Sequence, residues 1–188
     1  MGWVIQMAGP PGSGKSTIAA ALGARYRIPV LDVDVIKSSL LEAGIAIADV
    51  GPVAYRVLRD LAPAMAEQSG SVILDSPCHH PEVLQAGQRL GEAVGAPFVV
   101  IECWSDDLGL LDRRIRARRA LRSQRRSVAD GPVDLPEAPD PRATFEGWMT
   151  GSLVPETGHL RVDAQQPPEV AVRAVDEFLA GLGVTEEQ

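Results

Sequence analysis

The eight residues from Gly9 to Ser16 read G-P-P-G-S-G-K-S, which matches the composition and spacing of a loop that binds phosphate groups. Glycine tolerates backbone torsions that are closed to other residues and has no Cβ, so the N–H groups of such a loop can converge on phosphate oxygens. An apolar run precedes the loop and a helical pattern follows it, so the positive end of a helix dipole adds to the same site. The segment therefore predicts a binding site for the phosphates of a nucleoside triphosphate.

We expect the nucleotide to contact six consecutive residues, which are Gly12, Ser13, Gly14, Lys15, Ser16 and Thr17. The Lys15 ammonium is expected to bridge the β- and γ-phosphates, and the Ser16 hydroxyl to bind Mg²⁺. The alternative is a glycine-rich turn that only connects a strand to a helix, and the complete match in its context argues against it. The predicted cofactors are therefore Mg²⁺ and either ATP or GTP.

Three aspartates follow predicted strands and could hold a metal or accept a proton. Asp32 and Asp34 end one apolar run, and Asp75 ends the run Ser71–Leu74. Because the carboxyl ends of parallel strands meet at one edge of a sheet, these side chains should lie near the phosphate loop. We assign Asp34 as the base for an attacking hydroxyl, and Asp32 and Asp75, with Ser16, to the Mg²⁺ shell. The alternative for Asp32 and Asp34 is that each only caps the helix that follows.

Four polar residues follow Asp75 within five positions. Ser76 is expected to contact the acceptor or the metal shell. Cys78, His79 and His80 have the side chains of zinc ligands, but adjacent side chains diverge and no second cluster completes a tetrahedral shell. We therefore interpret these three as the lining of an acceptor pocket or as loop surface.

Eight arginines lie between positions 113 and 126, and helical phase distinguishes one of them. At about 100° per residue, Arg118 falls on the same stripe as the apolar Leu111 and Ile115. A guanidinium in such a position needs an anion, and a triphosphate supplies one. Arg118 is therefore predicted to be catalytic and nucleotide-binding, and Arg114, at the edge of the stripe, to be nucleotide-binding.

The elements that must position these residues follow from five apolar runs separated by helical patterns. The runs are Trp3–Met7, Pro29–Val33, Ser71–Leu74, Phe98–Cys103 and Leu160–Val162. Their alternation with helices predicts an α/β fold in three layers, with a five-stranded parallel sheet between helices. The length suits a single domain over residues 1–188.

Helices are expected at 15–25, after Asp34, at 53–68, from an N-cap at Ser105 to Arg126, and from Pro168. Pro63 should kink the third of these or split it in two. The arginine-rich helix and the proline-rich loop at 130–141 are expected to form a lid, over approximately 113–141, that excludes water during transfer.

Charge and composition exclude several classes of protein. A net charge of −7 argues against nucleic acid as a partner, because that attraction depends on Lys and Arg. Of 18 Lys and Arg residues only Lys15 and Lys37 are lysines, and neither can build the guanine-reading N-K-x-D element of a Ras-like GTPase. No apolar run approaches the roughly 20 residues that cross a bilayer, so we expect a cytoplasmic protein. No feature indicates an oligomeric state.

These motifs resemble those of the small P-loop kinases related to nucleoside monophosphate kinases. The most similar branch includes gluconate and shikimate kinases, chloramphenicol phosphotransferase and the polynucleotide 5′-kinase domain. The matching pieces are G-P-P-G-S-G-K-S-T at Gly9–Thr17, D-x-D-x-x-K at Asp32–Lys37, V-I-L-D-S at Val72–Ser76 and R-I-x-x-R at Arg114–Arg118. The resemblance implies a P-loop NTPase fold, with Asp34 activating the acceptor and Arg118 as the lid arginine. It also implies Arg114 near the adenine, and Lys37 where relatives often have a substrate-contacting Arg.

Taken together, the motifs predict a kinase that moves the γ-phosphoryl group of Mg-ATP or GTP to a hydroxyl of a small molecule, such as a sugar, a nucleoside or a hydroxyl-bearing antibiotic. Relatives build their acceptor pockets from the region of Leu41–Arg59, so Tyr55 and Arg56 are assigned to the substrate with Lys37. Surface solvation is the alternative for Tyr55 and Arg56. Two other functions compete with this one: a polynucleotide 5′-hydroxyl kinase, and a regulatory ATPase without an acceptor.

Overall fold

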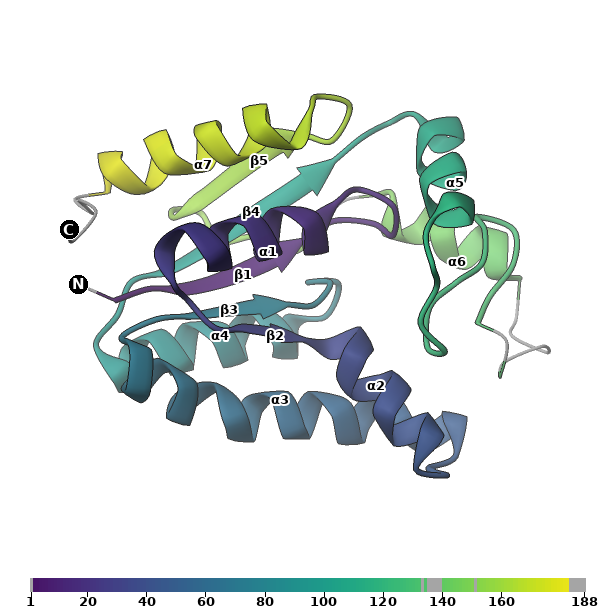
Figure 1. The fold of residues 1–188 in the computed structure, drawn as a ribbon, viewed down its shortest axis with the longest axis horizontal. Helices are drawn as coiled ribbons and strands as arrows, with labels where there is room; N and C mark the ends of the chain where they lie inside the picture. The colour runs from purple at the N-terminus through teal and green to yellow at the C-terminus, as the bar shows by residue number, and fades with distance from the viewer. Residues whose placement is uncertain (1, 133, 135–139, 151, 183–188) are drawn as a thin grey trace.

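The computed structural model describes residues 2–132, 134, 140–150 and 152–182. At its centre lies a sheet of five parallel strands in the order β2-β3-β1-β4-β5. The strands are β1 (Val4–Ala8), β2 (Val30–Asp32), β3 (Val72–Asp75), β4 (Phe98–Trp104) and β5 (His159–Asp163). Their carboxyl ends face the right of the view in Figure 1. The predicted α/β class and the five-stranded parallel sheet are therefore confirmed.

Helices cover both faces of this sheet (Figure 1). They are α1 (Lys15–Tyr26), α2 (Val33–Glu42), α3 (Ile47–Ser69), α4 (Pro81–Val94), α5 (Leu108–Ala117), α6 (Pro141–Trp148) and α7 (Pro168–Gly181). On one face, Ile5 of β1 belongs to a core with Leu22 of α1 and Val175 of α7. On the other face, Val4 belongs to a core with Leu58 of α3. Because β1 is buried on both faces, it reads as a continuous apolar run.

The helix α3 corrects one expectation from the sequence. It runs unbroken from Ile47 to Ser69 through Pro63, so the predicted split is wrong. Its buried residues recur at every fourth position from Val50 to Ala66. This packing against the sheet maintains the helix across the hydrogen bond that Pro63 cannot donate.

The helix α5 is shorter than the sequence predicts. It ends at Ala117 instead of Arg126, because Arg118 adopts an extended backbone with φ −76° and ψ 152°. Its N-cap is Asp107, whose carboxylate accepts a hydrogen bond from Leu110 N at 2.9 Å, so the predicted cap at Ser105 is also wrong. The irregular residues that follow, 118–132, are called the lid segment. Of the predicted lid at 113–141, positions 133 and 135–139 lie outside the described residues.

Two further observations concern the helices in the described ranges. Two helices, α4 and α6, lie in stretches for which no helix bounds were predicted, and α6 lies beside the lid segment. No helix in these ranges combines the length and the apolar character needed to cross a membrane.

Glu102 of β4 is completely buried and connects the sheet to the chain that leads into β5. Its carboxylate accepts hydrogen bonds from Arg161 Nε at 2.6 Å and from Ser152 N at 3.2 Å, with His159 Nε2 3.4 Å away. Burial alone would raise the pKa of Glu102, but the hydrogen bonds from Arg161 and Ser152 outweigh it and hold the pKa below its usual value. The ionised carboxylate therefore stabilises the fold.

We expect Glu102→Gln to lower the free energy of unfolding by about 1–3 kcal/mol at pH 7, because the charged acceptor of two hydrogen bonds is lost. A lowered pKa stabilises the fold above the ordinary carboxyl pKa, and this stabilisation disappears as pH falls through the folded-state value. The difference between variant and wild type should therefore shrink below about pH 4 in urea titrations. Glu92→Gln, at an exposed position of α4, serves as the control and should change little. A difference that is the same at pH 7 and at low pH would contradict this account.

Candidate active site

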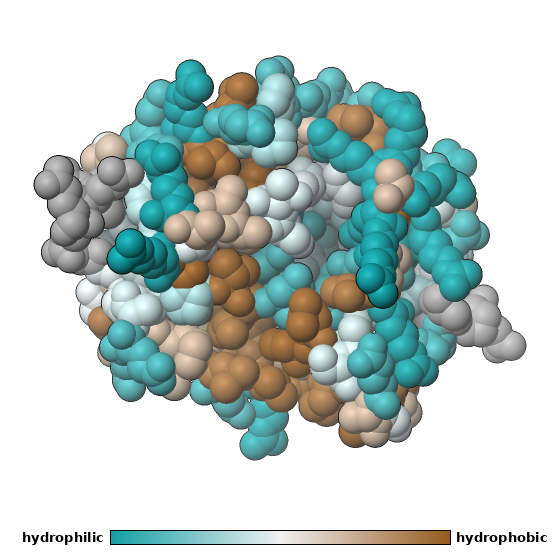
Figure 2. All heavy atoms as spheres, in the orientation of Figure 1, coloured by the Kyte–Doolittle hydropathy of each residue, from teal (hydrophilic) through white to brown (hydrophobic). Residues whose placement is uncertain are grey.

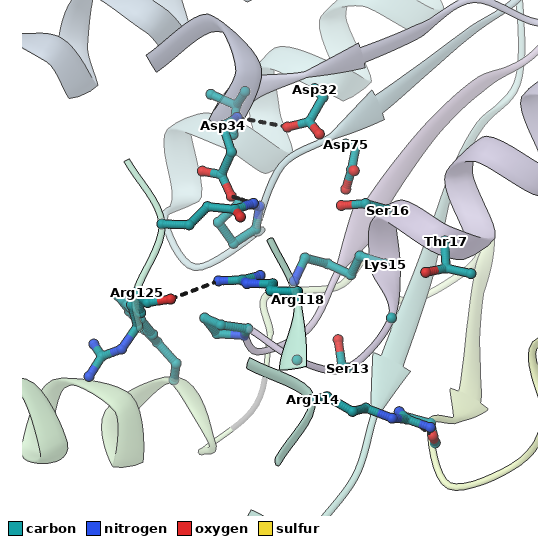
Figure 3. Close-up of a pocket in the computed structure, with 18 of the residues that line it drawn as sticks. Ser13, Lys15, Ser16, Thr17, Asp32, Asp34, Asp75, Arg114, Arg118 and Arg125 are labelled. Carbon is teal, nitrogen blue, oxygen red and sulfur yellow. Dashed lines mark hydrogen bonds between the residues drawn. The ribbon is translucent and has the colours of Figure 1, made fainter. Parts of the chain in front are cut away.

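A cavity of about 900 Å³ opens at the carboxyl ends of β1, β2 and β3. The phosphate loop, the start of α2, the lid segment and α6 contribute its walls. In Figure 2 hydrophilic side chains gather on the right of the view, over α5 and the lid segment. Figure 3 shows Lys15, Asp34, Asp75 and Arg118 directed toward a common space. The fold therefore brings the three predicted catalytic residues and the predicted metal ligand Asp75 together from four separate segments.

The backbone of the phosphate loop requires glycine at two crowded positions. Gly9 and Gly12 have positive φ angles of 120° and 84°. A Cβ on Gly9 would lie 2.0 Å from the carbonyl oxygen of Cys103, and one on Gly12 would lie 2.7 Å from that of Leu111. No other residue fits either position, so the loop keeps the shape that exposes its N–H groups.

Lys15 begins α1 at the end of the loop, and its ammonium reaches back to donate hydrogen bonds to the carbonyl oxygens of Gly9 at 2.8 Å and Pro10 at 3.0 Å. Burial lowers the pKa of Lys15, and Asp75 is the largest charge that opposes this effect. Carbonyl oxygens only partly compensate a buried cation, so phosphate oxygens would be stronger partners. Ser13, also in the loop, is buried and its Oγ has no hydrogen-bond partner among the described residues.

Asp75 and Ser16 form the part of the site that suits a divalent cation. Burial raises the pKa of Asp75 to about 6, while Lys15 and a hydrogen bond with Ser16 act in the opposite direction. The Oδ2 atom of Asp75 is buried without a hydrogen-bond partner among the described residues. A buried carboxylate oxygen beside a hydroxyl fits the oxygen ligands that Mg²⁺ prefers. Figure 3 places Thr17 on the far side of Ser16 from Asp75.

Asp32 and Asp34 play different structural roles at the start of α2. Asp32 caps the helix, since its Oδ1 accepts hydrogen bonds from Asp34 N at 2.8 Å and Val35 N at 3.3 Å. It also pairs with Asp75 across β2 and β3, so the two carboxylates are neighbours at the sheet edge. Burial raises the pKa of Asp32. The carboxylate of Asp34 caps nothing and lines the cavity, where its Oδ2 accepts a hydrogen bond from Gln124 Nε2 at 3.0 Å.

Arg118 follows α5 directly and faces the cavity from the lid side (Figure 3). Its Nη2 donates to the carbonyl oxygen of Arg125 at 3.2 Å, but its Nε is buried without a partner among the described residues. Burial lowers the pKa of Arg118, and Asp34 is the largest charge that opposes this effect. Arg114 also lines the cavity, and its Nη1 donates to the carbonyl oxygen of Ala164, just after β5, at 2.7 Å.

Of the five residues assigned to the acceptor, Asp34 and Lys37 line the cavity, and the other three, Tyr55, Arg56 and Ser76, do not. The ring of Tyr55 lies 5.1 Å from the Lys37 ammonium, but it lines a second cavity of about 720 Å³ between α3 and α4. Arg56 is exposed and pairs with Asp60 at 3.7 Å. Ser76 is buried, and its Oγ accepts a hydrogen bond from Gln6 Nε2 at 3.1 Å.

The residues after Ser76 diverge, and one of them joins the cavity wall. Cys78 is buried and His80 lines the second cavity, whereas His79 lines the first. The His79 ring stacks on Trp148 of α6 with centroids 5.6 Å apart, and burial lowers the pKa of His79 to about 4, so the ring is neutral at pH 7. The guanidinium of Arg125 lies 5.2 Å from the centroid of the Trp148 ring. It donates hydrogen bonds to the carbonyl oxygens of Val128, in the lid segment, and Pro141, the first residue of α6, and so holds the lid segment and α6 together.

Sequence reasoning missed Gln124 and Ser123 of the lid segment. Both donate hydrogen bonds to Asp34. Ser123, 89 positions away in the chain, donates from Oγ to the Asp34 carbonyl oxygen, and Gln124, 90 positions away, donates from Nε2 to Asp34 Oδ2. No motif or periodicity marks such contacts, because they depend on how the lid segment lies over α2.

Comparison with known proteins supports this architecture. A family model described as an AAA domain matches residues 4–134, which include the phosphate loop, the three aspartates and Arg118. No curated protein matches the chain.

Several solved structures have the same fold. A candidate kinase from Chloroflexus aurantiacus J-10-fl is 23% identical, with 95% of this chain and 96% of that chain covered and a TM-score of 0.69. The APS kinase of Mycobacterium tuberculosis, solved in complex with AMPPNP and APS, is 18% identical, with 95% and 98% covered and a TM-score of 0.61. A gluconokinase from Sinorhizobium meliloti 1021 is 17% identical, with 95% and 92% covered and a TM-score of 0.61. These likenesses confirm the expected P-loop kinase fold.

We expect Lys15→Met to weaken the binding of Mg-AMPPNP by about 2–5 kcal/mol, because the loop loses its only ammonium. Isothermal titration calorimetry measures the effect. Lys37→Met, which changes the one other lysine of the chain and leaves the loop intact, serves as the matched control and should bind the nucleotide like wild type. Equal affinity of the Lys15 variant and the wild type would refute the assignment of the phosphate site.

Asp75→Asn should remove most of the gain in nucleotide affinity that magnesium provides, by a factor of about 10–100. The variant should stay folded, because the amide has the shape of the carboxylate, but it should melt at a lower temperature than wild type, since the Lys15 ammonium loses its main opposing charge. Titrations of AMPPNP with and without magnesium, together with melting curves, separate the two effects. An undiminished response to magnesium would show that Asp75 does not serve the metal.

Proposed function

The chain belongs to the AAA domain family, and we propose that it is a phosphotransferase that moves the γ-phosphoryl group of Mg-ATP or Mg-GTP to a hydroxyl of a small molecule. One observation carries the proposal: Asp34, a carboxylate that caps nothing, faces the same cavity as Lys15 of the phosphate loop. A site that only binds a nucleotide has no need of a carboxylate base on this wall. The solved kinases of the same fold support the same class of reaction.

In the proposed reaction, an acceptor hydroxyl oxygen attacks the γ-phosphorus while Asp34 accepts its proton. The new oxygen–phosphorus bond forms as the bond to the β–γ bridging oxygen breaks, and the nucleoside diphosphate leaves with that oxygen. Lys15 and Arg118 would hold the phosphate oxygens and offset their developing charge. Ser16 and Asp75, with Asp32 nearby, would hold Mg²⁺, which would supply positive charge to offset that of the phosphate groups.

The nucleotide and the acceptor are proposed to occupy opposite parts of the 900 Å³ cavity. Arg114, held beside the end of β5, belongs to the nucleotide side. Lys37, the neutral ring of His79 and Trp148 belong to the acceptor side, where an ammonium and flat rings suit a small polar molecule. The net charge of −7 argues against a polynucleotide as the acceptor and fits an enzyme of the cytoplasm.

The proposal is tested by incubating the protein with γ-labelled ATP or GTP and a panel of sugars, nucleosides and hydroxyl-bearing antibiotics. Mass spectrometry then identifies a product that has gained one phosphoryl group. Loss of label to water alone, across the whole panel and with both nucleotides, would favour a regulatory ATPase instead.

Asp34→Asn should lower kcat for transfer by about 100-fold or more, because the acceptor proton loses its base. Binding of Mg-AMPPNP should remain within about twofold of wild type, since Asp34 does not belong to the phosphate loop. Asp49→Asn, at an exposed position of α3, is the matched control and should leave transfer unchanged. Transfer by the Asp34 variant at the rate of wild type would rule out this residue as the base.

A further inference from the structure

The lid segment lies on α2 through hydrogen bonds that surround the proposed base. Ser123 Oγ donates to the carbonyl oxygen of Asp34 at 3.0 Å, and Ser123 N donates to Ser38 Oγ at 3.1 Å. Arg122 Nη1 donates to the carbonyl oxygen of Leu41, at the other end of α2, at 2.9 Å. Ser38 is buried under this contact. The lid segment is therefore attached along the length of α2.

One further contact reaches the carboxylate itself. Gln124 Oε1 accepts a hydrogen bond from Leu121 N at 3.2 Å, within a turn that Gln124 N closes on Leu121 O at 2.9 Å. Because its oxygen is engaged in this way, the amide of Gln124 must present its nitrogen to the other side. There Nε2 donates to Asp34 Oδ2 at 3.0 Å. The partners on both sides thus fix the orientation of the amide.

Because of this contact, the two carboxylate oxygens of Asp34 have different surroundings. A neutral amide donor occupies Oδ2 without the positive charge of a Lys or Arg partner. The second oxygen, Oδ1, accepts no hydrogen bond from the residues that the structure describes, and the carboxylate lines the cavity. A base must lie within hydrogen-bond reach and in line with the proton that it accepts, so a fixed carboxylate plane favours transfer.

We propose that Gln124 is a positioning residue that orients Asp34 for the acceptor hydroxyl and does so only while the lid segment lies on α2. The proposal rests on the proposed function, because it requires Asp34 to act as the base. Its consequence is that lid position and base orientation change together. Lifting the lid segment from α2 removes Gln124 from Oδ2, and an open site then has a base that is free to rotate.

The kinetic test measures phosphate release from γ-labelled Mg-ATP with water as the acceptor, and transfer to any compound that the panel identifies. Gln124→Ala should lower kcat about tenfold while KM for ATP stays within about twofold, since the phosphate loop is untouched. In an Asp34→Asn background, Gln124→Ala should cause no further loss, because the residue acts through Asp34. Gln85→Ala, at an exposed position of α4, is the matched control and should behave as wild type.

A second measurement follows hydrogen exchange of the amides at residues 121–125, and it does not depend on turnover. Gln124→Ala should increase their exchange, and Ser123→Ala should do so as well, but Ser123→Ala should reduce kcat less because the contact with Oδ2 remains. Unchanged exchange in Gln124→Ala, or an equal loss of kcat in the wild-type and Asp34→Asn backgrounds, would overturn the proposal.

The same experiments separate this proposal from the proposed function. If Asp34→Asn retains the turnover of wild type, the assignment of Asp34 as the base is wrong, whatever the hydrogen exchange of residues 121–125 shows. If Asp34→Asn loses turnover and Gln124→Ala does not, Asp34 is the base and only the role of Gln124 is wrong.

Discussion

Lys15, which is part-buried, and Asp75, which is buried, carry charges that each depend on the other. Burial disfavours the ionised form of both, and for each the other residue is the largest opposing charge. Their proximity follows from the pairing of β1 with β3, because Lys15 begins the helix after β1 and Asp75 ends β3. Two further residues lie beside this pair. Ser16 forms a hydrogen bond with Asp75, and Asp32 is the register partner of Asp75 across β2 and β3. A polyanion would supply a further partner for the Lys15 ammonium, and a divalent cation would supply one for the Asp75 carboxylate.

The parts of the site that the sequence predicted are those encoded by local geometry. The phosphate loop needs glycine wherever a Cβ would meet the backbone of another segment, and this requirement is visible in G-P-P-G-S-G-K-S. The three central strands, β1, β3 and β4, were found because burial on both faces produces continuous apolar runs. Asp75 was found because a carboxylate directly after such a run lies at the ligand edge of a parallel sheet. The lid predicted over 113–141 is described only in part, and its role stays a prediction.

The parts that the sequence did not predict depend on tertiary contacts. Arg118 was placed on a helix, whereas the helix ends one residue earlier, although the side chain still reaches the cavity. Pro63 was expected to kink α3 or split it in two, but the helix is not split, because its packing on the sheet overrides that local preference. Gln124 reaches the cavity from a segment without periodicity or motif, so only the folded chain shows its partner. The placement of Arg56 on the surface likewise depends on which face of α3 meets the sheet.

The close approach of Gly12 to Leu111 has a mechanical consequence. The phosphate loop touches the backbone of α5 directly, with the side chain of Ile115 next to it, and leaves no room for even a methyl group. A rearrangement of the loop around an incoming triphosphate would therefore displace α5, and Arg118 follows the last residue of that helix. Binding of a nucleotide would thus move Arg118, on the opposite wall of the cavity, through contact between two backbone segments and without a flexible side chain between them.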